Sequence, residues 1–497
     1  MDPQTNVAEL LTALKAATQI ADPRMSEALQ KSTFSQSGSA TTGLTFYDLE
    51  SGAKFLYPVL TPLRNMIARV SGRGGIQANW KAVTGVNVNS LSLGVSGGNR
   101  GAVQAVSTAD FSASYHGLGI ESNVDFEAQY AAQNLIDVRA VAGRTGLEAM
   151  MLGEEKIILG GNNSIALGTG GTPSVAVVTT GGSFSATQYV KVVPLTLNGV
   201  MTATVAGGVQ GQVTRTNADG STDNINTGNG AVSAGATATV SSGSTNSVTA
   251  SCAAKRGAVG YAWFWGPTSG SEVLGAITTG PFITITAAAT GTQLASAAAV
   301  GTDYSQDSLV FDGLLTQAFK SGSNAYWADL GGATLTADGD AGIVEIDAAL
   351  KDRWDNYRLS PDTMWVNSQQ ALDIGRKILA GNANGAFRIN VDMQQGMIAG
   401  GIMVSAYLNR FSMDGAKTIA IKIHPNMPAG VILMTTRSLP YPLSNVGNIM
   451  QIVTRQEYYQ IEWPLRSRRY EYGVYADEVL QHYAPFSMCL ITGIKAG

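Results

Sequence analysis

Charged side chains are scarce in this sequence. They make up 14% of its 497 residues, against roughly 25% in ordinary globular proteins. A freely soluble enzyme of this size usually carries more surface charge, so we expect a surface that neighbouring molecules largely cover. The net charge of −4 excludes a global basic field that would drive nucleic-acid binding.

Cysteine and histidine are also few. Cys252 and Cys489 lie far apart in regions of different composition, which excludes a disulfide framework and favours folding in the cytosol. His116, His424 and His482 form no HExxH motif, and no CxxC pair occurs, so we expect no metal site. Cys489 lies in an apolar segment and is interpreted as a buried structural thiol, not a nucleophile.

Motifs for cofactor chemistry are missing. No GxxxxGK[ST] loop occurs, and the Gly-rich segment 94–101 lacks the following helix that a phosphate cradle needs. Acidic turns at 338–340 and 219–223 match no EF-hand loop and are interpreted as plain turns. Without a triad-like grouping we expect no catalytic residue, no cofactor and no enzyme activity.

Long apolar runs are lacking as well. No stretch of about 18 apolar residues predicts a membrane span, so no membrane partner is expected. The N-terminal segment does not resemble an export signal. Asp2 and Glu9 stand where such a signal would be basic, and Lys15 interrupts the apolar stretch that follows.

The first half of the chain has recognisable elements. Helical spacing of Val7, Leu10, Leu11 and Leu14 predicts a short amphipathic helix, followed by a Ser/Thr/Gly-rich arm at 31–45. The helix has two interpretations of equal weight: packing on its own domain, or docking on a neighbouring subunit.

Residues 76–118 are expected to form a long two-stranded hairpin. Trp80 and Val83 lead to a Gly-rich tip at 94–101, and Phe111 follows on the returning strand. Isolated hairpins are marginal in water, and the apolar face here is thin. We therefore expect the hairpin to lean on another chain.

Residues 122–159 carry apolar or small residues at helical spacing and predict a single helix roughly 55 Å long. Ser122 followed by Asp125 resembles an N-cap with an acidic first turn. Gly143 and Gly146 weaken the helix and indicate close packing or a bend.

Composition changes sharply between 162 and 304, where only eight of 143 residues are charged. Short Val/Thr runs alternate with Gly/Ser/Asn turns, a pattern typical of a β-sandwich. The aromatic segment 260–265 suits a central strand. The expected strands are 175–178, 189–193, 201–205, 236–240, 247–250, 261–265 and 282–285.

Ordinary charge returns after 305, and an α+β pattern follows. Helices are expected at 309–319, 343–358 and 368–379. The expected strands are 364–367, 402–407, 418–423, 431–434, 449–453, 472–474 and 488–491.

This order of arm, hairpin, long helix and mixed α/β region, with residues 359–367 (LSPDTMWVN), resembles the Hong Kong 97-type fold of tailed-bacteriophage major capsid proteins. The resemblance covers about 1–161 and 305–497. It implies an N-terminal arm (1–75), an E-loop with the start of the peripheral domain (76–121), a spine helix (122–161) and the axial with the remaining peripheral domain (305–497). The departure is an inserted immunoglobulin-like sandwich (162–304).

The resemblance implies hexamers and pentamers that tile an icosahedral head around double-stranded DNA, bound without sequence specificity. It implies assembly in the host cytoplasm, residence in the virion, and scaffold, portal and decoration proteins as further partners. The resemblance also implies that the insert is displayed outward. Two alternatives remain open for it: it binds host surfaces or glycans, or it is a passive protrusion.

Six residues are candidates for contacts between subunits. Arginine favours planar, bidentate pairing in partly buried interfaces, which we favour for the 466–471 cluster over contact with packaged DNA. The candidates are Trp80, Arg100, Arg466, Arg468, Arg469 and Glu471. An encapsulin-type compartment is the main alternative, because it shares the fold; a surface adhesin and a hydrolase are less favoured.

Overall fold

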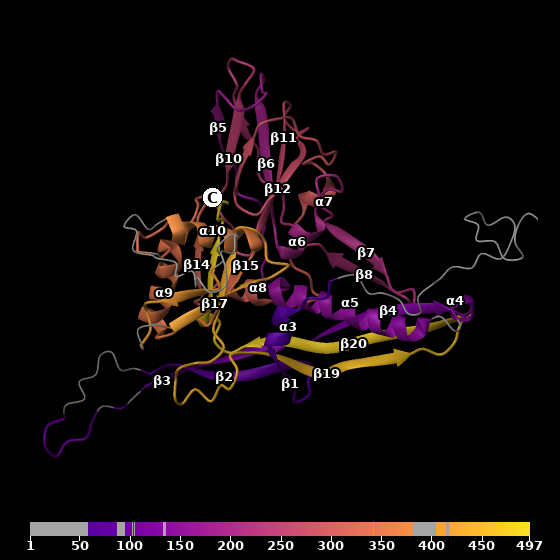
Figure 1. Cartoon of the computed structure of the whole chain (residues 1–497), viewed down its shortest axis with the longest axis vertical. Coiled ribbons are helices and arrows are strands. Elements are labelled where there is room, and N and C mark those ends of the chain that lie inside the picture. The colour runs from indigo at the N-terminus through magenta and orange to yellow at the C-terminus, as the bar shows by residue number, and fades with distance from the viewer. Residues whose placement is uncertain are drawn as a thin grey trace, which may run out of the picture. The chain divides into compact units, whose positions relative to one another are not determined.

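The computed structural model describes residues 58–497 except 87–94, 102, 104, 133–135, 341, 381–403 and 414–416. Within this part, residues 58–127 and 139–497 form one compact unit, whose elements are labelled in Figure 1. The expected N-terminal helix and the arm at 31–45 lie outside the described residues. The described chain mixes helices with strands throughout, so the predicted α+β class is confirmed.

A four-stranded sheet, which we call the peripheral sheet, has the order β1-β19-β20-β4. Its long strands β19 and β20 pair antiparallel, while the short β1 joins β19 in parallel. Helix α5 lies along this sheet (Figure 1), and its buried residues recur every fourth position, at Gly146, Met150, Glu154 and Ile158. The elements are α3 (Pro62–Met66), β1 (Ala68–Ser71), β4 (His116–Asp125), α5 (Val138–Gly160), β19 (Met450–Glu462) and β20 (Arg469–His482). The short helix α4 (Phe126–Ala131) follows β4 in the chain, and its residues 128–131 lie outside this unit.

The long helix begins later than the sequence predicts. Residues 116–125 form strand β4, in which Ser122 pairs with Tyr472 of β20, and so Ser122 is no helix cap. Helix α5 starts only at Val138. The single helix predicted at 122–159 is therefore wrong in two respects: residues 122–125 belong to strand β4, and the helical residues 126–131 form a separate short helix, α4. Pairing along ten residues of β20 outweighs the helical spacing at 122–125.

The predicted hairpin is confirmed. Strands β2 (Gln77–Val86) and β3 (Val106–Ser114) pair antiparallel, with a register shift between Val83 and Gly85. Trp80 lies opposite Phe111 in this register.

A six-stranded mixed sheet, which we call the axial sheet, has the order β14-β21-β18-β15-β17-β16. Its central strands are buried on both faces, because Met364 packs with helices α9 and α10 while its neighbour Trp365 packs on the side of α8. The elements are α8 (Leu314–Phe319), β14 (Tyr326–Asp329), α9 (Val344–Tyr357), β15 (Thr363–Val366), α10 (Ser368–Ala380), β16 (Ala406–Asn409), β17 (Lys417–Ile423), β18 (Ile432–Thr435), the 3-10 turn η1 (Pro485–Ser487) and β21 (Cys489–Thr492).

Two antiparallel sheets occupy the charge-poor region, with the orders β13-β10-β5 and β12-β11-β6-β9. Val190, Trp263 and Val248 meet between them in one apolar core. A second core, with Phe264 and Leu274, lies on the other side of β11 and β6. The elements are β5 (Ser174–Val178), β6 (Gln188–Leu195), α6 (Leu197–Thr202), β7 (Gln212–Thr216), β8 (Thr222–Asn226), β9 (Ala236–Ala238), β10 (Ser247–Ser251), β11 (Gly260–Gly266), β12 (Val273–Thr278), β13 (Phe282–Ile285) and α7 (Ala298–Gly301).

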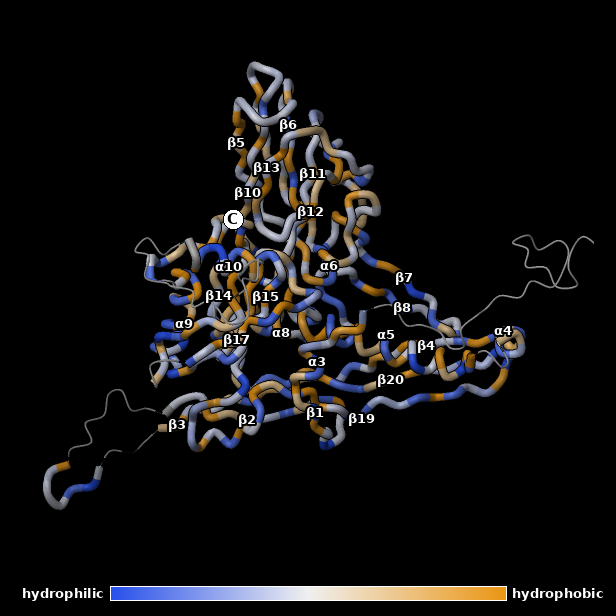
Figure 2. The backbone as a smooth tube through the Cα atoms, in the orientation of Figure 1, coloured by the Kyte–Doolittle hydropathy of each residue, from blue (hydrophilic) through white to orange (hydrophobic). Residues whose placement is uncertain are grey.

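Six of the seven strands expected in this region are present. The strand expected at 201–205 is wrong, because residues 197–202 form helix α6 with Thr196 as its N-cap. The antiparallel ribbon β7–β8 was not foreseen. Figure 2 shows hydrophobic stretches along the strands of both sheets and alternating character along β7.

Candidate assembly interface

The base of hairpin β2–β3 is anchored on the peripheral sheet. The Trp80 ring stacks on Phe111 with centroids 5.7 Å apart and meets Tyr483 edge-on at 5.8 Å. Ala78 and Ala113 pack against the main core. The hairpin therefore leaves the unit in a defined direction, and Trp80 fixes its base within the same chain.

Beyond Trp80 the hairpin has apolar side chains open to solvent. Val83 and Val106 lie on the face of the hairpin opposite Trp80 and are 64% and 53% exposed, whereas Phe111, which pairs with Trp80 on the other face, is 43% exposed. Arg100 lies in the exposed tip. A two-stranded ribbon has too little burial to be stable alone, so the face with Val83 and Val106 is the first candidate for contact with a neighbour.

The arginine cluster lies at the far end of the peripheral sheet. Arg469 forms an ion pair with Asp125 at 2.6 Å, and Arg468 forms one with Glu127 at 2.9 Å. Both pairs are strongly exposed. Arg466 lies in the exposed turn between β19 and β20, and Glu471 is half-buried in β20. The structure thus brings Arg468 and Arg469 to acidic partners in their own chain.

A buried charge cluster supports the middle of the peripheral sheet. Glu154 of α5, fully buried, accepts hydrogen bonds from Arg64 (2.8 Å), Arg69 and the Tyr458 hydroxyl. Arg69 also pairs with buried Glu478 at 2.9 Å. Both guanidinium groups lie over the Tyr458 ring, at 5.1 and 4.8 Å from its centroid. Burial and the neighbouring Glu478 raise the pKa of Glu154 to about 8, against the lowering effect of Arg69 and Arg64.

The adjacent Glu155 joins three segments. Its carboxylate accepts the backbone N–H of Leu63 (2.9 Å) and of Arg64 (2.7 Å), the first turn of α3. The same carboxylate is 2.6 Å from His424 Nε2, and both side chains are fully buried. Asn426 N–H donates to His424 Nδ1 at 3.1 Å. Nδ1 is therefore the acceptor, and His424 is the tautomer whose Nε2–H donates to Glu155.

These residues were missed from the sequence. Two adjacent glutamates inside the apolar run Met150–Ile158 were the available signal, because charges in such a position are almost always paired. Their partners are separated from them by 92 residues for Leu63 and 269 for His424, and nothing local in the sequence identifies them.

Cys489 and His482 are two further buried side chains that can titrate. Burial raises the pKa of the Cys489 thiol to about 12. Burial lowers the pKa of His482 to about 3; its Nδ1 accepts the Ala484 N–H at 3.2 Å, and its Nε2 has no partner. In the described part of the chain, no three His, Cys, Asp or Glu side chains are grouped to hold a metal ion.

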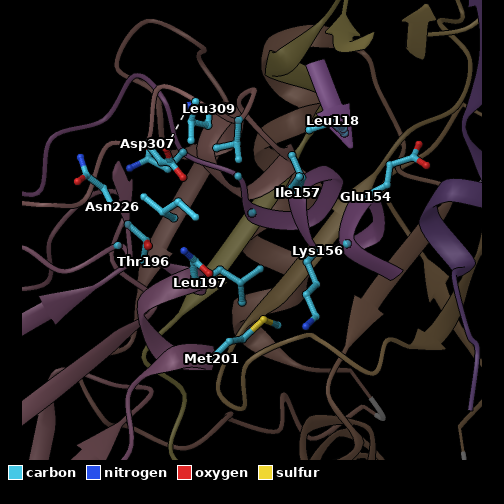
Figure 3. Close-up of a pocket in the computed structure, with 18 of the residues that line it drawn as sticks. Leu118, Glu154, Lys156, Ile157, Thr196, Leu197, Met201, Asn226, Asp307 and Leu309 are labelled. Carbon is cyan, nitrogen blue, oxygen red and sulfur yellow. Dashed lines mark hydrogen bonds between the residues drawn. The ribbon is translucent and has the colours of Figure 1, made fainter. Parts of the chain in front are cut away.

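A cleft of about 420 Å³ lies between α5, strand β4 and the segments around α6 and β8. Leu118, Ile157, Leu197 and Met201 give it apolar walls, and Lys156 lies at one side (Figure 3). None of the residues predicted as contact sites lines it. Among the described helices, none is long and apolar enough to cross a lipid bilayer.

No protein-family model matches the sequence, and a comparison with curated proteins finds no match. Solved structures do match. They include the capsid of the Myoviridae phage XM1 (10% identity, 92% of this chain and 97% of that chain, TM-score 0.37) and the capsid of an empty GTA particle (8%, 91% and 95%, 0.40). A third is the holo-SrpI encapsulin complex from Synechococcus elongatus (9%, 90% and 93%, 0.36). The chains that this protein is similar to are thus phage capsid chains and an encapsulin chain.

Proposed function

We propose that the protein is the major capsid protein of a tailed phage, which self-assembles as hexamers and pentamers into an icosahedral head around double-stranded DNA. The single observation that carries the proposal is hairpin β2–β3. It is firmly anchored at Trp80 and apolar beyond it, with Val83 and Val106 more than half exposed. Such an element gains its burial only from another subunit.

Covering the exposed apolar side chains of the hairpin contributes free energy to each contact between subunits. Fully burying a Val or Phe side chain contributes about 1.5–3 kcal/mol. Val83 and Val106 are 64% and 53% exposed on one face of the hairpin, so covering both contributes roughly 2–3.5 kcal/mol per contact. Each subunit in a closed shell both gives and receives such a contact, and weak contacts repeated many times yield a stable shell.

The rest of the unit supplies a rigid support for that contact. One apolar core runs from Ile452 and Val474 of the peripheral sheet to Trp365 and Leu490 of the axial sheet. The buried Glu154 cluster adds specific pairing within it. A chain built in this way suits a structural role. We propose that Arg100, Arg466 and Glu471 contact neighbouring subunits. Arg468 and Arg469 are proposed to shape the surface beside Arg466 and Glu471.

The inserted region, which we place at 162–304, is proposed to be an immunoglobulin-like sandwich on the outside of the shell. Its sheet β12-β11-β6-β9 follows the spatial order C′-C-F-G, and β13-β10-β5 follows E-B-A. Trp263 on β11, fully buried, takes the place of the tryptophan on strand C. Along the chain these positions are filled in the order A-F-G-B-C-C′-E, so the strand connections differ from the immunoglobulin order, and the proposal rests on the packing of the two sheets and on Trp263.

Electron microscopy of the expressed chain tests the proposal. Uniform shells with hexameric and pentameric capsomers are expected, and nuclease-protected DNA inside particles from producing cells separates a phage head from an encapsulin-type compartment. A monodisperse small oligomer at high concentration, with a scaffold protein present, would overturn the proposal.

A pair of variants ties assembly to the hairpin. Val83→Asp, 64% exposed on β2, is expected to block shells while leaving the circular dichroism spectrum unchanged. Val178→Asp, 41% exposed on β5 of the sandwich, is the control and is expected to assemble. Normal shells from Val83→Asp contradict the assignment of the hairpin as the contact.

A further inference from the structure

The inserted sandwich is attached by two chains that run side by side. Asp307 N–H donates to the Asn162 carbonyl at 2.8 Å, and the Asn162 amide donates to the Ser305 carbonyl at 2.7 Å. Gly313 N–H donates to the Gly161 carbonyl at 2.9 Å. This double connection is hydrogen-bonded along its length, so it differs from a pair of flexible linkers.

The base of the sandwich is part of the main core. Leu197 of α6 and Val259, 4% and 2% exposed, belong to the same apolar cluster as Ile158 and Leu159 of α5. The last residue of α5 is Gly160, and a Cβ built there would lie 2.5 Å from the Leu197 side chain. Leu197 therefore packs directly on the backbone of the spine helix.

A second contact reaches the axial part. The Arg256 guanidinium donates to the Phe319 carbonyl at 3.1 Å and lies over the Trp327 ring, 4.7 Å from its centroid. Phe319 ends α8, and Trp327 belongs to the edge strand β14. The sandwich thus contacts the axial sheet at an edge that is independent of α5.

Hairpin β7–β8 comes close to the peripheral sheet across a cleft. It runs from the sandwich along α5 (Figure 1), and Arg215 and Ile225 form one wall of the cleft whose other wall includes Ile120 and Ile157. The Asn226 amide holds the base of the hairpin to the Gln306 carbonyl at 2.7 Å.

We propose that the inserted sandwich is an internal brace, which ties the axial sheet, the spine helix and the peripheral sheet into one cooperative unit. Its base replaces surface that the spine helix and α8 would otherwise expose, and β7–β8 spans from it to the edge of β4. In this role the insert is required for the rest of the chain to fold. The proposal concerns the single chain and holds whether or not the chain builds a shell.

Hydrogen exchange on the full chain tests this with two buried leucines. Leu197→Ala removes a side chain shared between sandwich and spine helix, whereas Leu274→Ala removes one confined to the core of the insert. Leu197→Ala is expected to speed exchange in the second half of α5 and in α8 on the order of 100-fold. Because Leu274 lies within the core of the insert, any faster exchange in α5 or α8 of the Leu274→Ala variant comes from loosening of the insert alone.

If the insert is a brace, Leu274→Ala also speeds exchange in α5 and α8, because loosening the insert loosens what it supports. Exchange confined to residues 174–300 in both variants would overturn the proposal.

A truncation addresses the hairpin and does not disturb the buried base. Replacing residues 213–225 by a short Gly/Ser turn is expected to speed exchange about tenfold or more at 117–120 and 153–157, with α9 unchanged as the internal reference. Unchanged exchange at both segments would refute the span to β4. Deleting 172–300 is expected to give insoluble chain, and a soluble deletion variant with an unaltered melting temperature for the remainder would refute the brace as a whole.

Discussion

Replacing Glu155 by glutamine is expected to detach α3 from the spine helix. In the native chain the carboxylate accepts three donors, the N–H groups of Leu63 and Arg64 and His424 Nε2–H. An amide offers one acceptor oxygen and two N–H donors of its own. Either orientation of the substituted amide therefore places an NH2 group against at least one buried donor.

The magnitude follows from those bonds. Losing charge-assisted hydrogen bonds costs about 1.5–3 kcal/mol, and each buried donor left unpaired adds about 1–3 kcal/mol. We expect Glu155→Gln to destabilise the docking of α3 by about 3–5 kcal/mol. The assay is hydrogen exchange at 62–71 and 424–427, where a loss of about 3 kcal/mol corresponds to a rate increase of roughly 150-fold.

Asp355→Asn is the matched control, an acid-to-amide change in the exposed pair with Lys351, 2.7 Å apart on α9. Its effect should stay below about 0.5 kcal/mol. Exchange at 62–71 that is equally slow in Glu155→Gln and in the control would refute the reasoning that Glu155 fixes this junction.

Three further outcomes are expected. Gly160→Ala should destabilise the chain because the new Cβ would lie 2.5 Å from the Leu197 side chain. Gly153→Ala in the same helix places its Cβ in open space and should stabilise the chain by up to about 1 kcal/mol. Equal melting temperatures for the two variants would contradict this. In the unfolded chain His482 takes up a proton below pH 6.5, whereas in the folded chain, where burial lowers its pKa, it does so only near pH 3. Stability should therefore fall as the pH drops through that window, by about 1.4 kcal/mol per pH unit. His482→Gln should flatten the slope of the unfolding midpoint against pH, and an unchanged slope would count against the assignment. Cys489, fully buried with its pKa raised to about 12, should not react with a thiol reagent in native protein but should react after unfolding; rapid native labelling at Cys489 would show that β21 is exposed.

Hairpins and sandwich strands could be predicted because their signals are local. Trp80 and Phe111 carry the alternation of the hairpin, and Tyr261, Trp263 and Trp265 carry that of β11. The boundary between β4 and α5 could not, because it depends on β20, whose partner residues are more than 340 positions away in the sequence.

Several candidate contact residues have partners within their own chain. Trp80 stays a predicted contact residue, and its ring packs on Phe111 and Tyr483 at the base of the hairpin. Arg468 and Arg469 have partners, Glu127 and Asp125, in their own chain. Sequence distance hid that pairing, as it hid the Glu154 and Glu155 cluster.

Strand β21 has a consequence for synthesis of the chain. It lies between β14 and β18 in the axial sheet, and its alternate residues complete both cores, Leu490 in one and Cys489 with Ile491 in the other. A nascent chain on the ribosome therefore cannot close either core until residues 489–492 have left the exit tunnel. Products of premature termination lack this interior strand of the sheet, so they should be degraded before they complete either core.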